Sequence, residues 1–334
     1  MATTTNPILV RPTDQEQVAI WAHGHAEWGA HLTPAQYEAR ERRLLATRLL
    51  RRGGLTPWML TPSDGADGDR QRRALASCET LRKRALVRVG GGPVWLVRAE
   101  GVASVFVEPR LRGRGYAALM MRLLASRLGG EPDVAFSVLL RSKLASSPPP
   151  PSPPTTIRLA LIPDLATLQW HFARQDFLAA HIDSLPRLPG EPVRGALYED
   201  GDESRVWALW TVKSEPSRRQ QAETNKLELL RLSYPESISQ PQLQTAVEAV
   251  IGSAVSQSRR WLCTSIQVWN PDERLRPILD SMTHLQPELV DREDSSIASL
   301  LWLGGQDGCG GKGPGAEEEE VHVDWIANDK FGWC

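Results

Sequence analysis

Hydrophobic and polar positions in the first 140 residues predict strands and helices in an α/β order. An apolar run rich in β-branched residues spans 102–107 and is typical of a strand, whereas residues 116–128 place leucine and methionine side chains along one stripe of a helix. By the same criteria, strands are expected at 8–13, 55–62, 74–80, 97–109 and 133–140, and helices at 14–29, 33–50 and 115–128. Short turns join some strands and a helix joins others, so the sheet should be mixed.

A similar pattern returns after residue 160. Helices are expected at 163–182, 240–258 and 272–282, and strands at 195–200, 206–213, 226–234, 262–270, 295–304 and 321–327. This order repeats that of the first half and adds two elements. We therefore expect the halves to share one topology, so that residues 196–334 superpose on residues 55–140.

Two low-complexity segments divide the chain. Residues 141–160 are rich in proline, which removes main-chain donors and fixes φ, so we expect a linker between domains at 1–140 and 161–334. Residues 304–320 combine glycines with a run of glutamates, a composition that cannot bury apolar area. They predict a flexible loop within the second domain.

Length and charge fit a protein of two ordinary domains. The chain has 334 residues, of which 41% are hydrophobic. Its 39 Lys and Arg nearly balance its 40 Asp and Glu, for a formal net charge of -1. A dedicated DNA-binding protein is therefore disfavoured, and any basic patch must be local.

The cysteines and the N-terminus indicate a soluble protein of a reducing compartment. Cys78, Cys263, Cys309 and Cys334 form no CxxC pair, which argues against a zinc site or a disulfide framework. The N-terminus lacks a basic end followed by an apolar stretch, and no apolar run reaches the roughly 18 residues of a membrane helix. We expect a cytoplasmic protein without metal, membrane or nucleic-acid partners.

The most informative motif lies between the strand ending at Val107 and the helix starting near Tyr116. Arg110, Gly113 and Gly115 fit the spacing R-x-x-G-x-G. Glycines permit a tight turn and leave no Cβ in the way of an anion, and the helix start adds unpaired N–H groups and a positive dipole end. The turn could bind a pyrophosphate, be a solvated basic loop, or contact nucleic acid.

The surroundings favour the pyrophosphate. A strand precedes the turn, Pro109 stops that strand, and a helix follows. The third glycine and the acidic residue of the dinucleotide fingerprint are missing, and no Gly-Lys-Ser/Thr of a P-loop follows. RNA binding through residues 81–88 and 110–115 is the weakest alternative, because no aromatic residues are interleaved with these charges.

Residues 102–128, VASVFVEPRLRGRGYAALMMRLLASRL, resemble the acetyl-CoA-binding motif of the GNAT acetyltransferases. With ASCET at 76–80, LLWLG at 300–304 and DWIANDKFGWC at 324–334, they resemble fungal lysine N-acetyltransferases, in which a second domain follows the GNAT domain. The resemblance implies an α/β fold class: a GNAT-like mixed twisted sheet flanked by helices, and a second C-terminal α/β domain of degenerate GNAT topology.

The resemblance also implies an activity and a binding site. The protein would transfer acetyl from acetyl-CoA directly to a small-molecule amine, the side-chain amine of lysine, in a ternary complex. Main-chain N–H groups of residues 112–116 would bind the pyrophosphate, nearby arginines would add positive charge, and the pantetheine arm would pair with the strand like an extra strand. The implied cofactor-binding residues are Val105, Phe106, Val107, Arg110, Arg112, Gly113, Arg114, Gly115 and Tyr116.

The reaction needs a base, because a lysine amine with a pKa of ~10.4 is almost fully protonated at neutral pH. Glu79, on the strand expected beside the cofactor strand, is the candidate catalytic residue. The alternative is a strand-end carboxylate paired with Arg82 or Arg84. Tyr116 could donate a hydrogen bond, although its place at a helix start also fits packing over the cofactor or the core.

A set of histidines and a set of tryptophans each allow a structural and a functional interpretation. The histidines His23, His25 and His31 lie near one another without a carboxylate partner, which favours helix-surface or capping roles over a metal site. The tryptophans Trp302, Trp325 and Trp333 are expected to build the C-terminal core, or to line a substrate pocket.

The chain departs from the family after Leu140. GNAT domains continue there with a helix bearing a tyrosine acid and a further strand, whereas no tyrosine lies between Tyr116 and Tyr198 here. Three explanations fit this departure. Other segments complete the fold, or the protein has lost the leaving-group acid and part of the cofactor wall. In the third, the segment after Leu140 is mistranslated from an intron boundary. The rival function is a catalytically impaired protein that binds acyl-CoA or a partner.

The second half lacks the glycine turn. After the strand expected at 226–234, residues 235–242 read PESISQPQ. The C-terminal domain should therefore not bind CoA, and we expect it to shape the acceptor side or to support the first domain.

Overall fold

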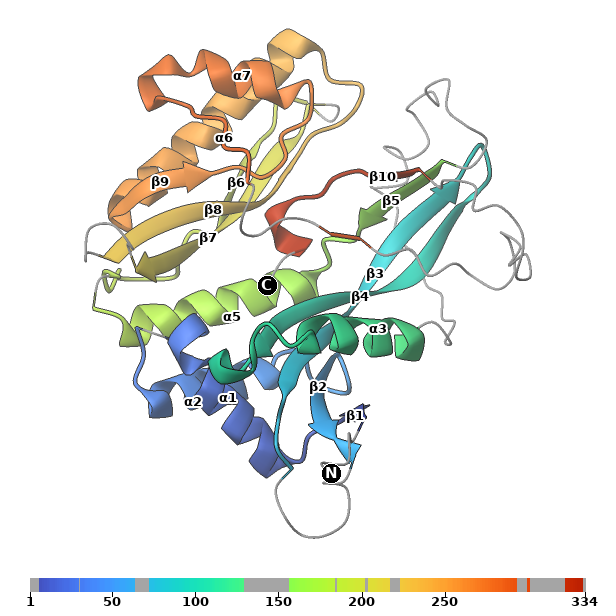
Figure 1. The fold of residues 1–334 in the computed structure, drawn as a ribbon. Coiled ribbons are helices and arrows are strands. Elements are labelled where there is room, and N and C mark those ends of the chain that lie inside the picture. The colour runs from blue at the N-terminus through green and yellow to red at the C-terminus, as the bar shows by residue number, and fades with distance from the viewer. Residues whose placement is uncertain are drawn as a thin grey trace.

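The protein is an α/β molecule with two mixed sheets. A computed structural model, shown in Figure 1, describes residues 6–29, 31–63, 72–128, 156–183, 185–201, 204–216, 223–292, 299–300 and 322–332. Within these residues, one sheet has six strands and the other has four. The expected α/β class is confirmed.

The first sheet collects strands from both ends of the chain. Its strands are β1 (Pro7–Val10), β2 (Leu55–Pro62), β3 (Ala76–Val89), β4 (Val94–Val107), β5 (Ile157–Leu161) and β10 (Val323–Trp325). Their order is β1-β2-β3-β5-β10, and β4 pairs with the other edge of β3. Neighbouring strands are antiparallel except β5 and β10, which run parallel.

β5 lies partly inside the segment expected to be a linker. It begins at Ile157, soon after the last proline of that segment at Pro154, and pairs with β3. Beyond Pro154 the residues again carry main-chain N–H groups, and the apolar side chains of Ile157 and Leu159 are buried, so a central strand can form. Because β5 and β10 both follow the prolines, later segments complete this sheet, which agrees with the first alternative given for the departure after Leu140.

Several expectations fall outside the described residues. They are the strand at 133–140, the loop at 304–320 and most of the strand at 295–304. The division into domains at 1–140 and 161–334 stays a prediction.

Three helices accompany the first sheet. They are α1 (Asp14–Trp28), α2 (Pro34–Leu45) and α3 (Tyr116–Leu128). α1 and α2 begin with capping boxes, and α2 has Pro34 in its first turn, as the sequence predicts. α2 ends before the expected residue 50, because residues 46–54 form turns. α3 buries Met120 and Leu124 in a cluster with side chains of β2 and β3.

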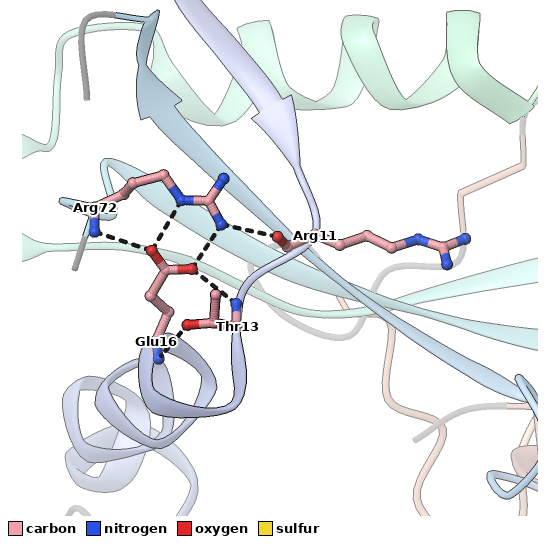
Figure 2. Close-up of polar contacts among 4 residues, drawn as sticks. All are labelled: Arg11, Thr13, Glu16 and Arg72. Carbon is pink, nitrogen blue, oxygen red and sulfur yellow. Dashed lines mark hydrogen bonds and ion pairs between the residues drawn. The ribbon is translucent and has the colours of Figure 1, made fainter. Parts of the chain in front are cut away.

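One ion pair connects the start of α1 to the residues before β3 (Figure 2). Glu16, which is 3% exposed, accepts hydrogen bonds from Nε of Arg72 at 2.9 Å and from Nη2 of Arg72 at 2.7 Å. It also accepts one from the N–H of Thr13 at 2.7 Å, and Arg72 donates to the carbonyl of Arg11 at 3.0 Å. The hydrogen bond from Arg72 is the main reason that the pKa of Glu16 falls to about 2.

The second sheet comes from the second half of the chain. Its strands are β6 (Gly195–Tyr198), β7 (Val206–Pro216), β8 (Glu223–Ser233) and β9 (Cys263–Gln267), and its helices are α5 (Leu165–His181), α6 (Gln240–Arg260) and α7 (Leu275–Ser281). β6, β7 and β8 are antiparallel, and β9 returns parallel to β8 after α6. α6 buries apolar side chains, including Leu243 and Val247, in the main cluster on this sheet.

The two halves share part of their topology. In the first half, β2, β3 and β4 form an antiparallel meander followed by α3, and in the second half β6, β7 and β8 form one followed by α6. The strand that would correspond to β9 is the one expected at 133–140, which lies outside the described residues. The shared topology is therefore supported over the elements from β2 to α3.

α5 and the C-terminal segment lie between the two sheets in Figure 1. α5 packs Trp170 in a cluster with Leu81 of β3, and packs Phe177 in another with Val212 of β7. Phe331, in the short 3-10 turn Lys330–Gly332, is buried with Leu168 and Leu230.

Polar contacts also hold the C-terminal segment to both sheets. Lys83 of β3 donates to the carbonyl of Gly332 at 2.7 Å, and Asp329 pairs with Arg231 of β8. The buried ring of His171 donates from Nε2 to the carbonyl of Phe331 at 3.1 Å. Burial lowers the pKa of His171 to about 3, so this ring is neutral.

None of the helices in the described part of the chain combines the length and the apolar character needed to cross a membrane. The described residues also contain no group of three His, Cys, Asp or Glu side chains that could hold a metal ion.

Candidate active site

The glycine turn has the shape expected of an anion-binding loop. Pro109–Leu111 form a 3-10 turn after β4, and α3 begins at Tyr116. Gly113 and Gly115 have φ of 77° and 79°, values that L side chains rarely adopt. A Cβ built at either glycine would meet nothing within 4 Å, so the turn faces open space. The structure thus leaves room for a ligand beside the main chain.

The start of α3 offers main-chain donors to that space. The carbonyl of Gly115 accepts the N–H of Leu119 at 2.9 Å, which marks the first turn of the helix. N–H groups at such a start have no partner within the helix, and the dipole favours an anion. The predicted use of residues 112–116 as a pyrophosphate cradle is consistent with this geometry and stays a prediction.

Arg112 contacts the end of α1. Its Nη2 donates to Glu27 at 3.0 Å, its Nε donates to the carbonyl of Val107 at 3.2 Å, and its guanidinium lies 5.9 Å from the Phe106 ring centroid. Trp28 packs edge-on against the same ring, with centroids 5.9 Å apart. The turn, the end of β4 and the end of α1 therefore form one continuous surface.

β4 is an edge strand among the described residues, because its only described partner is β3. Val105 is 42% exposed on it, whereas Phe106 is buried. An edge strand leaves a row of main-chain N–H and C=O groups unpaired. The expected pairing of a pantetheine arm with Val105, Phe106 and Val107 is therefore sterically reasonable.

A β-bulge interrupts β4 at Ser104. Ser77 faces Phe106 and Glu79 faces Ala103, so two residues of β4 stand opposite one residue of β3. Ser104 has a φ of 53°, which is rare for a residue other than glycine. Such strain of about 1–3 kcal/mol is often found at functional sites, and a bulge leaves main-chain groups outside the ladder. The sequence carries no glycine or proline here that would indicate it.

A cavity of about 380 Å³ adjoins the bulge. Side chains from α1, α2, β3 and β4 line one part of it, and α5 contributes Trp170 and Arg174. Lys213 of β7, Glu228 of β8 and Lys330 of the C-terminal segment line the rest. Both halves of the chain therefore build the cavity.

Glu79 lies in the wall of this cavity. Burial raises its pKa to about 7, and the nearby charge of Glu41 acts in the same direction. Hydrogen bonding from the Ser104 hydroxyl, the charge of Arg40 and the indole of Trp21 oppose the shift. A carboxyl that titrates near neutral pH is suited to accept a proton from a substrate.

The pairing of Glu79 with Arg82 or Arg84 is not what the structure shows. Glu79 is inside β3, where β2 and β4 pair with it on both sides, and Arg84 pairs instead with Asp164 at 3.5 Å. Successive side chains of a strand point to opposite faces of the sheet. Arg82 and Arg84 are each an odd number of positions from Glu79 along β3, so their side chains are on the other face. This alternative for Glu79 was wrong.

Buried polar atoms without a hydrogen-bond partner among the described residues occur in the cavity wall. They include Oε1 of Gln17 and Nε1 of Trp170. A buried polar atom without a partner costs roughly 1–3 kcal/mol. The cavity is therefore suited to a ligand that carries polar groups.

The described histidine, tryptophan and tyrosine candidates take part in contacts that support the fold. The ring of His25 hydrogen-bonds from Nε2 to the carbonyl of Leu32 at 2.6 Å, in the turn after α1. Trp325 is in β10, at the edge of the first sheet, whereas Trp302 and Trp333 lie outside the described residues. Tyr116 packs against the cluster beneath α3.

A family model described as the LYC1 GNAT-like C-terminal domain matches residues 136–334. The chain belongs to this GNAT family. The resemblance to the GNAT acetyltransferases is thus confirmed at the level of the family, by a match that does not include the motif at 102–128. The description of the matched domain as GNAT-like also agrees with the meander and crossover helix of the second sheet.

Two known proteins are similar to this member of the LYC1 GNAT-like family. A lysine acetyltransferase of Yarrowia lipolytica (strain CLIB 122 / E 150) is 30% identical over 118 residues, which are 35% of this chain and 28% of that protein. The match therefore spans little more than a quarter of that protein. A GCN5-related N-acetyltransferase from Kribbella flavida aligns over 77% of this chain and 63% of its own, with 15% identity and a TM-score of 0.35.

Proposed function

We propose that the protein transfers an acetyl group from acetyl-CoA to an amine, and that the acceptor is the side-chain amine of lysine. The observation that carries the proposal is Glu79, a carboxyl with a pKa of about 7 in a cavity beside the bulge of β4. Membership of the GNAT family supports acetyl-CoA as the donor. Similarity to the Yarrowia lipolytica lysine acetyltransferase supports lysine as the acceptor.

The residues around the glycine turn fit the donor. The open side of Gly113 and Gly115 would take the pyrophosphate, with N–H groups of residues 112–116 as donors and Arg110 and Arg114 adding positive charge. The free edge of β4 would take the pantetheine arm. Acetyl-CoA, when bound, supplies an acetyl group activated as a thioester.

Glu79 would act as the general base. A lysine ammonium with a pKa of ~10.4 gives up its proton more readily once the cavity removes it from water, because burial disfavours the charged form. The Glu79 carboxylate would accept that proton and leave the amine free to attack. A main-chain N–H freed by the bulge at Ser104 would stabilise the negative charge that develops on the acetyl oxygen. The C–S bond of the thioester would then break, and CoA would leave as a thiolate that takes up the proton lost by the attacking nitrogen.

Calorimetry with acetyl-CoA, followed by assays of acetyl transfer to L-lysine and to a lysine peptide, tests the proposal. Binding and transfer are both expected. Absence of binding would contradict the whole proposal. Binding without transfer would support the rival function of an impaired acyl-CoA-binding protein, for which the lack of any tyrosine between Tyr116 and Tyr198 is the supporting observation.

The substitution Gly113→Glu tests the position of the pyrophosphate. It places a carboxylate in the open space of the turn and should weaken acetyl-CoA binding at least about 100-fold, because two like charges would share a site. Gly113→Asn, which tolerates positive φ, should keep most of the affinity. Gly91→Glu, in the open turn between β3 and β4, is the matched control and should bind normally. Normal binding by Gly113→Glu would show that the pyrophosphate site lies elsewhere.

A further inference from the structure

The two halves differ at the turn between the last strand of the meander and the helix that follows it. In the first half this is the glycine turn, in which Gly113 and Gly115 have positive φ and face open space. In the second half residues 234–239 connect β8 to α6, and none of these residues, all of which are described, has a positive φ. The two turns therefore present different main-chain groups to their surroundings.

The start of α6 uses its own side chains to satisfy its main chain. The hydroxyl of Ser239 accepts a hydrogen bond from the N–H of Gln242, and the side chain of Gln242 accepts one from the N–H of Ser239. This capping box uses N–H groups that an anion would otherwise bind. Pro241, in the first turn, has no N–H to offer. The start of α6 is thus a poor site for a phosphate group.

The guanidinium of Arg274 binds this turn through its oxygen atoms. It donates from Nη1 to the carbonyl of Glu236 at 3.2 Å, from Nη2 to the carbonyl of Ile238 at 2.5 Å, and from Nε to Oε1 of Gln240 at 3.2 Å. A guanidinium carries five N–H donors in one plane, and all three of its nitrogen atoms donate here. The turn therefore directs oxygen atoms at a cation.

The start of α7 fixes Arg274 in this place. Tyr234, at the beginning of the turn, donates to Oδ2 of Asp272 at 2.6 Å, and Oδ1 of Asp272 accepts the N–H of Arg274 at 3.2 Å. The guanidinium also lies 5.3 Å from the centroid of the Tyr234 ring. Burial and the hydrogen bond to Asp272 raise the pKa of Tyr234, so its hydroxyl stays protonated and keeps donating.

The charges near the turn also favour a cation over an anion. The carboxylates of Asp272 and Glu236 both act on Tyr234 in the direction that raises its pKa, which places negative charge beside the turn. The dipole of α6 disfavours a cation at this end of the helix. The oxygen acceptors and the carboxylates must therefore outweigh the dipole to hold Arg274 there.

We propose that the turn at 234–239 is a guanidinium-binding site that Arg274 occupies, in the position where the first half has its predicted anion-binding turn. The second half is then closed to the phosphate groups of an acyl donor by a side chain of its own, in addition to lacking the glycines. This site is independent of whether the first half transfers acetyl.

Removing the side chain and supplying its head group separately tests this site. Arg274→Ala should lower the melting temperature by about 5 °C or more, because three oxygen atoms lose a charged donor. Millimolar methylguanidinium chloride should restore at least about half of that loss, since it returns the same donors. Tetramethylammonium chloride, a cation without N–H donors, should restore nothing.

A matched control and a second variant keep the test specific. Arg276 is on the same helix, is exposed and pairs with Asp280 at 3.8 Å, so Arg276→Ala should change the melting temperature by less than about 1 °C and show no response to methylguanidinium. Arg274→Lys keeps the charge but loses the planar fork, and should melt below the unaltered protein even if Arg274→Ala does not fold. A lysine variant as stable as the unaltered protein, or equal effects of the two cations on Arg274→Ala, would overturn the inference.

Calorimetry with acetyl-CoA separates this inference from the proposed function. One acetyl-CoA per chain is expected for the unaltered protein and for Arg274→Ala, because the turn offers oxygen atoms rather than N–H groups even without the guanidinium. A second binding event in Arg274→Ala would show that the turn accepts phosphate and would overturn the inference. If neither protein binds acetyl-CoA, the proposed function is wrong, and the response of Arg274→Ala to methylguanidinium still supports or overturns the guanidinium site.

Discussion

The protonation of Glu79 should set the pH dependence of acetyl transfer. Its pKa is raised to about 7, so the carboxylate form that accepts a proton is the main form only above that pH. With the unaltered protein, kcat/KM should rise about tenfold per pH unit below pH 7 and level off above it. Glu79→Gln should lower kcat about 100-fold or more and remove this rise. Initial rates with L-lysine between pH 5.5 and 9 measure both effects.

Loss of activity in Glu79→Gln is not expected to come from unfolding. A carboxyl whose pKa is higher in the folded than in the unfolded state destabilises the folded protein as pH rises between the two pKa values. A neutral glutamine escapes this effect, so the variant should melt no lower than the unaltered protein at pH 8. A variant that retains the pH-dependent rise would show that another group is the base.

At the residue scale, residue types and spacing carry a signal that local backbone geometry does not. They made Glu79, which lines the cavity, and the two glycines, which adopt positive φ, candidates from the sequence alone. Ser104 was missed as a site residue, because a bulge with φ of 53° in a serine follows from the pairing of β3 with β4 and leaves no mark in composition. Arg174 and Lys213 were missed because they lie far along the chain from the motif and reach the cavity only through the fold.

At the scale of elements, the contact between Glu16 and Arg72 should contribute to stability. Arg72→Ala removes the two hydrogen bonds that the guanidinium donates to Glu16, keeps the one from the main-chain N–H, and leaves that carboxylate buried beside the cap of α1. Bonds to charged groups are worth about 1.5–3 kcal/mol each before compensation, so the free energy of unfolding should fall by about 2 kcal/mol in total. Urea denaturation at pH 7 measures it.

The effect of Arg72→Ala should depend on pH. The pKa of Glu16 is lowered to about 2 in the folded protein, so the stabilisation is fully present above the ordinary glutamate pKa and is lost as pH falls toward 2. The difference between the variant and the unaltered protein should therefore shrink on acidification. Arg73→Ala, at the neighbouring exposed position, is the control and should be neutral. A difference that stays constant from pH 7 to pH 3 would contradict this account.

Most elements could be predicted from local patterns, and the exceptions have a long-range cause. Capping residues and apolar stripes place the starts of α1, α2, α3 and α6 correctly, because these signals lie within or next to each helix. β5 was not expected because of the prolines that precede it, and its place beside β3 depends on pairing with residues far away in the chain. β10 was expected as a strand. Its pairing with β5 in the first sheet depends on tertiary contacts, which the periodicity of one segment does not reveal.

At the scale of the whole molecule, the C-terminal segment connects the two sheets and completes the cavity. β10 pairs with β5 of the first sheet, Asp329 pairs with Arg231 of the second, and Lys330 lines the cavity. Phe331, which is 1% exposed, packs with Leu230 of β8. Removing this ring should loosen the segment from both sheets at once.

Phe331→Ala should therefore change stability and acceptor binding together. Removing a buried phenylalanine ring costs about 3–5 kcal/mol, and displacement of Lys330 should raise the KM for L-lysine several-fold. Acetyl-CoA binding should stay close to normal, because the residues around the glycine turn and Phe331 pack in separate clusters. Trp95→Ala, at an exposed position on β4, is the control and should leave all three quantities unchanged. Thermal unfolding measures the stability, calorimetry measures acetyl-CoA binding, and initial rates measure the KM for L-lysine. If Phe331→Ala is destabilised but its KM for L-lysine is unchanged, the segment supports the fold without shaping the acceptor site.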